Sequence, residues 1–149
     1  MATANWYGQA AMGQFGTTPG RRINWTGDSQ KCLLTTTSYA QNIDTDTFQS
    51  DVTNEVTGTN YVAGGVALTT KTLTYDSATN EARMDADDVT FTNITVSGIL
   101  KAVFYDATPG TAGTNPLLFI YVFDGAQSVT AVDFVIQLAA TGAAKAVAT

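Results

Sequence analysis

Two runs of the sequence decide the fold: Ile99 to Tyr105, I-L-K-A-V-F-Y, and Leu117 to Phe123, L-L-F-I-Y-V-F. Both are short and apolar at successive positions, which is typical of strands that are buried on both faces. A loop rich in Pro, Gly and Thr, residues 106–115, separates them. We therefore predict that the two runs are central strands of a packed sheet.

Shorter stretches on either side of these runs are rich in Val, Thr, Ile and Phe and are bounded by turn residues, which predicts further strands. Residues 76–80 predict a hairpin loop, Gly98 a bulge or bend, and Asp124–Ala126 a turn. The pattern of the last strand points four side chains at the core: Val132, Phe134, Ile136 and Leu138. The predicted additional strands are 23–25, 31–37, 66–75, 81–86, 89–91, 94–96 and 132–138.

Short strands at this spacing, with no long helix, are typical of an all-β fold. We expect an antiparallel β-sandwich or a jelly-roll-like small barrel, with a short N-terminal helix or arm. The chain of 149 residues predicts a single β-sandwich domain, residues 1–149. Residues 44–48 are expected to form one helical turn.

The two ends differ from this pattern. Residues 4–15 could form a helix capped by Asn5, or an irregular arm, and we assign residues 1–20 to this arm. All apolar residues of the tail, residues 139–149, are small, and the tail is expected to be frayed or laid along another subunit. The arm either packs on its own domain or docks onto a neighbour, and its predicted partner contacts are Trp6, Tyr7 and Phe15.

Composition excludes several classes of function. Only 13% of the residues are charged and the net charge is −6, which argues against binding to nucleic acid or to an anionic membrane surface. The chain has no histidine, so Ser-His-Asp chemistry and histidine metal sites are absent. The lone Cys32 lies in an apolar strand pattern and is predicted to be a core residue. No signal peptide or membrane-spanning run is recognisable, so we expect synthesis in a cytoplasm.

The acidic residues offer weak candidates for chemistry. The run Asp85-Ala86-Asp87-Asp88 could supply oxygen ligands to Ca²⁺, although a solvated turn explains it better. Asp51 and Glu55 form a carboxylate pair that we interpret as capping or solvated rather than catalytic. Nucleotide-binding and hydrolase fingerprints are missing. We predict no catalytic residue, no cofactor and no metal site, and therefore no enzyme.

The segment Asp51 to Gly65, D-V-T-N-E-V-T-G-T-N-Y-V-A-G-G, carries a resemblance to a known family. It resembles the signature of small structural proteins of tailed bacteriophages and prophages, some of which are capsid decoration, or cement, proteins. Paired glycines such as Gly64-Gly65 also indicate a tight connection that leads into a strand. Other segments that look like the family are 5–8, 23–25, 31–34, 85–91, 103–106 and 116–118.

The resemblance implies a role in the virion. A decoration protein would bind the outside of the lattice of major capsid protein and would self-associate, a trimer being the natural symmetry. An alternative in the same class is a tail or head-fibre component that contacts the host surface, with surface aromatic residues binding a glycan.

Overall fold

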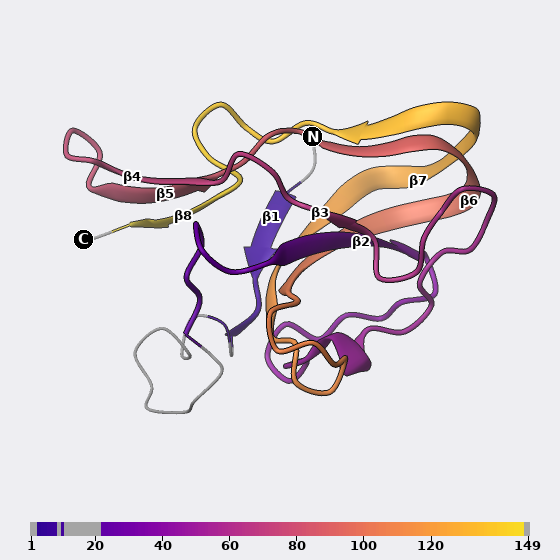
Figure 1. Ribbon diagram of the computed structural model, residues 1–149, viewed down its shortest axis with the longest axis horizontal. Coiled ribbons are helices and arrows are strands. Elements are labelled where there is room, and N and C mark those ends of the chain that lie inside the picture. Colours follow the sequence, from indigo (N-terminus) through magenta and orange to yellow (C-terminus); the bar gives the residue numbers. More distant parts are fainter. Residues whose placement is uncertain (1–2, 9, 11–21, 148–149) are drawn as a thin grey trace.

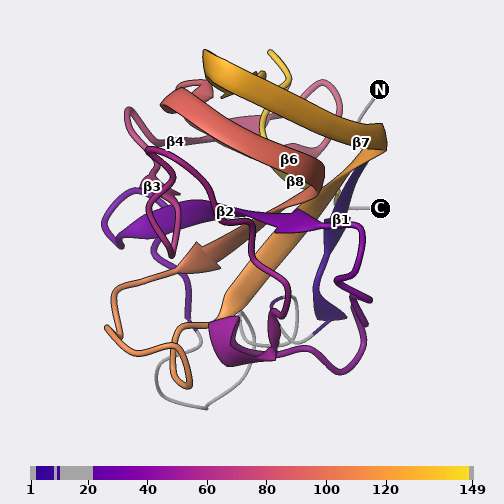
Figure 2. The same cartoon turned by 90° about the vertical axis from the view of Figure 1, so that its right-hand side faces the viewer.

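The computed structural model describes residues 3–8, 10 and 22–147, and they form an all-β protein with two antiparallel sheets (Figures 1 and 2). This confirms the predicted fold class. The larger sheet has five strands in the order β1-β7-β6-β2-β3, and the smaller has three in the order β4-β5-β8. The strands are β1 (Thr3–Trp6), β2 (Gln30–Thr36), β3 (Val66–Ala67), β4 (Thr72–Asp76), β5 (Glu81–Asp85), β6 (Val89–Asp106), β7 (Leu117–Ile136) and β8 (Ala144–Val147).

The fold is built on the pairing of β6 with β7, which are by far the longest strands. The two strands run side by side as a ribbon that curves over, so that its far half lies above the rest of the larger sheet (Figure 2). Side chains from the far half, such as Phe91 and Ile136, belong to the same apolar cluster as Phe104 and Phe119 from the near half. One pair of strands therefore supplies both layers of the sandwich.

Irregular pairing produces the curvature. The register of β6 against β7 shifts several times between Phe91 and Lys101, and each bulge bends a strand and increases its twist. Gly98 has a φ of +72°, which confirms the bend predicted at that residue. Between the pairs Ile99–Gln127 and Lys101–Val122, β6 advances two positions while β7 advances five. The extra residues of β7, 123–126, form a bulge in this strand.

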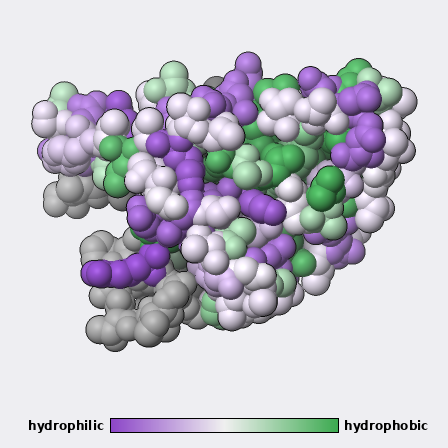
Figure 3. All heavy atoms as spheres, in the orientation of Figure 1, coloured by the Kyte–Doolittle hydropathy of each residue, from purple (hydrophilic) through white to green (hydrophobic). Residues whose placement is uncertain are grey.

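Apolar side chains cover both faces of the larger sheet, as predicted for its central strands. Alternate residues of β6 divide between two buried clusters, with Ala102 and Phe104 in one and Val103 and Tyr105 in the other. Cys32 of β2 is fully buried in the first cluster, which confirms its predicted place in the core. Seen from outside, hydrophobic and hydrophilic residues are mixed, and hydrophobic ones gather near the middle of the face drawn in Figure 3.

Two of the predicted strands need correction. Residues 23–25 form no strand, because the side chain of Asn24 accepts the Gly27 N–H and the Asp28 carboxylate accepts the Asn24 N–H, which makes a turn. The predicted strand 66–75 is two strands in different sheets, β3 and β4, and the chain changes direction near Thr70, whose φ is +48°. The predicted β4–β5 hairpin is confirmed.

The predicted turn at Asp124–Ala126 is also wrong, because β7 continues through it. Asp124 and Gly125 belong to the bulge in β7 and do not reverse the chain. Beyond it the core pattern holds for Ile136 and Leu138, which are buried, but not for Val132, which is exposed. The predicted helical turn at 44–48 is displaced: a hydrogen-bonded turn closes from Asn42 to Asp46, and the 3₁₀ turn assigned in the described residues is η1 (Gln49–Asp51).

Both chain ends take part in sheets. The helix predicted from residue 4 is wrong at its start, because Thr3–Trp6 is strand β1 and pairs with β7. Beyond it Gly8 and Ala10 are helical, and the rest of that prediction lies outside the described residues. In the predicted loose tail, residues 144–147 form β8 and pair with β5 of the same chain, and Ala143 is buried. This pairing corrects the expectation of a frayed tail or one laid on another subunit.

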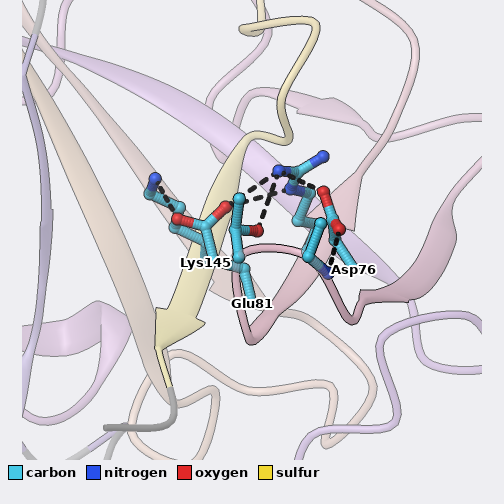
Figure 4. A network of polar contacts seen from close by, with 6 residues as sticks. Asp76, Glu81 and Lys145 are labelled. Atoms are coloured by element: carbon cyan, nitrogen blue, oxygen red, sulfur yellow. Dashed lines mark hydrogen bonds and ion pairs between the residues drawn. The ribbon is translucent and has the colours of Figure 1, made fainter.

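Charged side chains cross the smaller sheet from strand to strand (Figure 4). Glu81 of β5 lies at the centre, with one carboxylate oxygen 2.6 Å from the Lys145 Nζ of β8 and the other 3.0 Å from the Arg83 Nη2. Arg83 also bridges to Asp76 of β4 at 2.8 Å. Hydrogen bonds from Lys145, and then from Arg83, hold the pKa of Glu81 below its usual value of 4.5.

This network predicts an acid-dependent loss of stability. Because the pKa of Glu81 is lowered in the folded state, its stabilising effect is complete above pH 4.5 and is lost as the pH falls through the lower, folded-state pKa. We expect Glu81→Gln to lower the urea midpoint at pH 7, and the difference from wild type to shrink as the pH falls below 4.5. Asp44→Asn, which removes an exposed carboxylate elsewhere, is the control. Parallel acid profiles for wild type and Glu81→Gln would contradict the assignment.

Candidate functional site

Trp6 lies beside a hollow in the surface. The hollow has a volume of about 560 Å³, and its wall combines apolar side chains such as Tyr121 and Leu138 with the polar Gln137 and Lys145. The half-buried indole of Trp6 packs edge-on against Phe119, with 5.6 Å between ring centroids, and its Nε1 donates a hydrogen bond to the Lys145 carbonyl at 3.3 Å. The Trp6 ring therefore joins the edge of the larger sheet to β8 of the smaller one.

Tyr7 has a different environment and is fully buried. Its hydroxyl lies 3.0 Å from that of Tyr39, whose hydroxyl donates to the Asp46 carboxylate at 2.8 Å. Burial raises the pKa of both tyrosines well above the usual value. In this structure Tyr7 stabilises its own chain and presents no surface to a partner. Of the three predicted partner contacts, Trp6 borders the hollow, Tyr7 is buried, and Phe15 lies outside the described residues.

Lys101 is a buried cation that the sequence analysis did not single out. Its Nζ donates to the backbone carbonyl of Tyr39 and lies 5.3 Å from the centroid of the Tyr39 ring. Burial lowers the pKa of the Lys101 ammonium. The contact ties the loop around Tyr39 to β6. A single lysine within an otherwise apolar strand was the signal in the sequence, because a charge at such a position needs a buried partner.

The motif loop, Asp51–Gly65, is organised around the carboxylate of Glu55. The same Glu55 oxygen accepts the Tyr61 hydroxyl at 2.7 Å and the Gly64 N–H at 2.6 Å. Tyr61 in turn accepts the Leu34 N–H of β2 at 3.0 Å and stacks on Phe91 of β6. The motif loop therefore contacts both β2 and the far half of β6.

Glycines let the motif loop approach its neighbours closely. A Cβ on Gly58 would lie 2.0 Å from the Thr95 carbonyl oxygen, and one on Gly65 would lie 1.8 Å from that of Cys32. Gly64 and Gly65 also have positive φ, which glycine adopts without strain. This geometry agrees with the tight connection into a strand that the glycine pair predicted.

The acidic residues singled out in the sequence have separate structural partners. Asp51 caps η1 by accepting the N–H groups of Thr47 and Phe48 at 2.8 and 2.9 Å, so the capping interpretation holds for it. Asp87 accepts the hydroxyls of two threonines, and Asp88 accepts the Leu138 N–H. Across the described ranges, no three His, Cys, Asp or Glu side chains come together as ligands for a metal ion.

Comparison of the chain with protein-family models, curated proteins and solved structures found no significant match. In the part of the chain that the structure describes, no helix has the length and apolar character needed to span a bilayer.

The motif loop makes a prediction about stability. Gly65→Ala would place a methyl group against the Cys32 carbonyl at a φ of +72°, whereas Gly98→Ala has the same φ but open space around the new methyl group. We expect Gly98→Ala to lose about 1–2 kcal/mol from backbone strain. Gly65→Ala should lose about 1–3 kcal/mol more, because the new methyl overpacks the site. Urea unfolding of both variants measures the difference, and equal losses would show that the close approach does not matter.

Proposed function

We propose that this protein is a virion structural protein of a tailed bacteriophage, and specifically a decoration protein that binds the outside of the major capsid lattice. The observation that carries the proposal is that the motif loop packs against both layers of the fold. The residues that resemble the family signature, among them Glu55, Gly58, Tyr61 and Gly65, make the contacts that hold the two layers together. Because these signature residues have structural roles, a chain that carries them is expected to share its fold with that family. The resemblance therefore supports a common architecture.

The proposed mechanism is binding without turnover. A decoration protein stabilises a capsid by bridging neighbouring subunits, and stable interfaces bury on the order of 1,200–2,000 Å² in total. Trp6 is the strongest candidate anchor, since tryptophans beside hollows are frequent hot spots of binding. Among the large hydrophobic residues that the structure describes, Val62 in the motif loop is the most exposed, at 69%. Further copies would occupy equivalent positions, with trimers at three-fold axes as the simplest arrangement.

Substitution of Trp6 tests the proposed capsid contact. Deletion of the N-terminal arm is a poor test, because it would also remove β1 from the larger sheet. Trp6→Ala should weaken binding to capsids assembled from the major capsid protein of the same phage by at least about tenfold, the effect of losing a modest hot spot. Co-sedimentation over a range of concentrations measures the affinity. Val135→Ala, which trims an exposed apolar side chain on β7, is the control.

A second readout separates loss of contact from loss of stability, because Trp6 also packs on Phe119. Capsid binding by the wild-type protein should slow hydrogen exchange of the amides in residues 137–145, which border the hollow. Unchanged affinity of Trp6→Ala together with unchanged exchange would remove Trp6 from the interface. Failure of the wild-type protein to bind the capsids at all would overturn the proposed function.

The hollow beside Trp6 also favours a second candidate, a tail or head-fibre component that binds a host glycan. An aromatic ring next to polar groups, here Gln137, Thr141 and Lys145, suits sugar recognition. In this case purified host surface polysaccharide should bind saturably and Trp6→Ala should abolish the binding. Binding to polysaccharide without binding to capsids would select this candidate over the decoration role.

A further inference from the structure

Strand β4 is a free edge of the smaller sheet. It pairs with β5 on one side, and no described residue pairs with it on the other. The hairpin of β4 and β5 extends away from the larger sheet (Figure 1). The opposite edge, β8, is partly covered, because the Trp6 indole donates to the Lys145 carbonyl there. The open row of backbone groups therefore lies along β4.

The side chains of β4 do nothing to protect this edge. Soluble monomers usually guard exposed edge strands with lysine, proline, a bulge or very short length. The run Thr72-Leu73-Thr74-Tyr75 is neutral, β-branched or apolar, and pairs with β5 in regular register. Leu73 is 57% exposed and Tyr75 is 63% exposed, which is unusual for side chains of this size. Nearby Lys71 does not guard the strand, because its ammonium donates to the Asp28 carbonyl and the Gln30 side chain.

The sequence of β4 is complementary to itself when a second copy runs antiparallel with Thr74 at the centre. Thr74 then faces Thr74, and Leu73 faces Tyr75 of the second copy. Opposed aliphatic and aromatic side chains are favourable cross-strand pairs. Asp76 faces the neutral Thr72, so the register brings no like charges together, and Asp76 keeps its bridge to Arg83 of its own chain.

We propose that β4 is the interface for a second copy of this chain, which adds its own β4 across a two-fold axis at Thr74 to form a continuous six-stranded sheet. Leu73 and Tyr75 of both copies would form one apolar patch on one face of that sheet. The edge supplies backbone hydrogen bonds and the patch supplies burial, as in other cases of strand addition. The inference is independent of the proposed function. If the protein also forms trimers on a capsid, this contact would join one trimer to its neighbour.

Cysteine cross-linking tests the register directly. In the proposed pairing, Thr74→Cys places two thiols opposite each other, within the Cα separation of about 4.4–6.8 Å that a disulfide needs. Thr72→Cys places them four residues apart along the strands, about 13 Å, which is too far. We expect mild oxidation to give a covalent dimer of Thr74→Cys and none of Thr72→Cys. Cys32 is fully buried, and wild-type protein controls for it. Equal cross-linking of both variants, or none of Thr74→Cys, would overturn the register.

Sedimentation velocity tests the interface without cross-links. The double variant Leu73→Lys/Tyr75→Lys puts four positive charges in the patch and should shift the protein to half the assembled mass, or raise the dissociation constant at least about tenfold. Val132→Lys adds a charge at an exposed apolar residue of β7, outside β4, and should leave the mass unchanged. Circular dichroism confirms that each variant is folded. A wild-type protein with the same mass as the double variant across the concentration range would refute the interface.

Discussion

The bend in the β6–β7 pair is the constraint on which the rest of this structure depends. A straight strand of 18 residues, the length of β6, would extend about 60 Å and leave its apolar side chains in water. Bending the pair near Gly98 and the bulge at 123–126 brings its two halves onto the same cluster. The hydrophobic effect favours the bent form, because it buries Phe91 and Ile136 in one cluster with Phe104 and Phe119.

The motif loop holds the two layers in place. It reaches β2 through the Tyr61 hydroxyl and the close contact at Gly65, and it reaches the far half of β6 through Gly58 and the stacking of Tyr61 on Phe91. Glu55 fixes the conformation of the loop from within. A segment that looks like a surface connection in the sequence is thus a principal tertiary contact, and this explains its unusual density of glycine.

The smaller sheet connects the two proposed contacts, the capsid contact at Trp6 and the contact with a second copy at β4. Its β8 edge adjoins Trp6 and the hollow, whereas its β4 edge is open to a second copy. The ion pairs of Glu81 connect the strands between these edges. This charged network links all three strands and so supports both surfaces. The arrangement suits a protein that joins neighbours.

The sequence by itself determined the all-β class, the two central strands, the β4–β5 hairpin, the bend at Gly98 and the buried Cys32, because each depends on local pattern or on glycine. Tertiary structure alone decided which strands meet. The strand expected at 66–75 is divided between two sheets, the turn residues at 124–126 became a bulge, and residues 144–147 paired with β5. These outcomes depend on pairing between distant segments, which the local sequence does not specify. The same reason applies to the candidate site, where Trp6 and Tyr7 are neighbours in the sequence but only the packing sets one beside a hollow and buries the other.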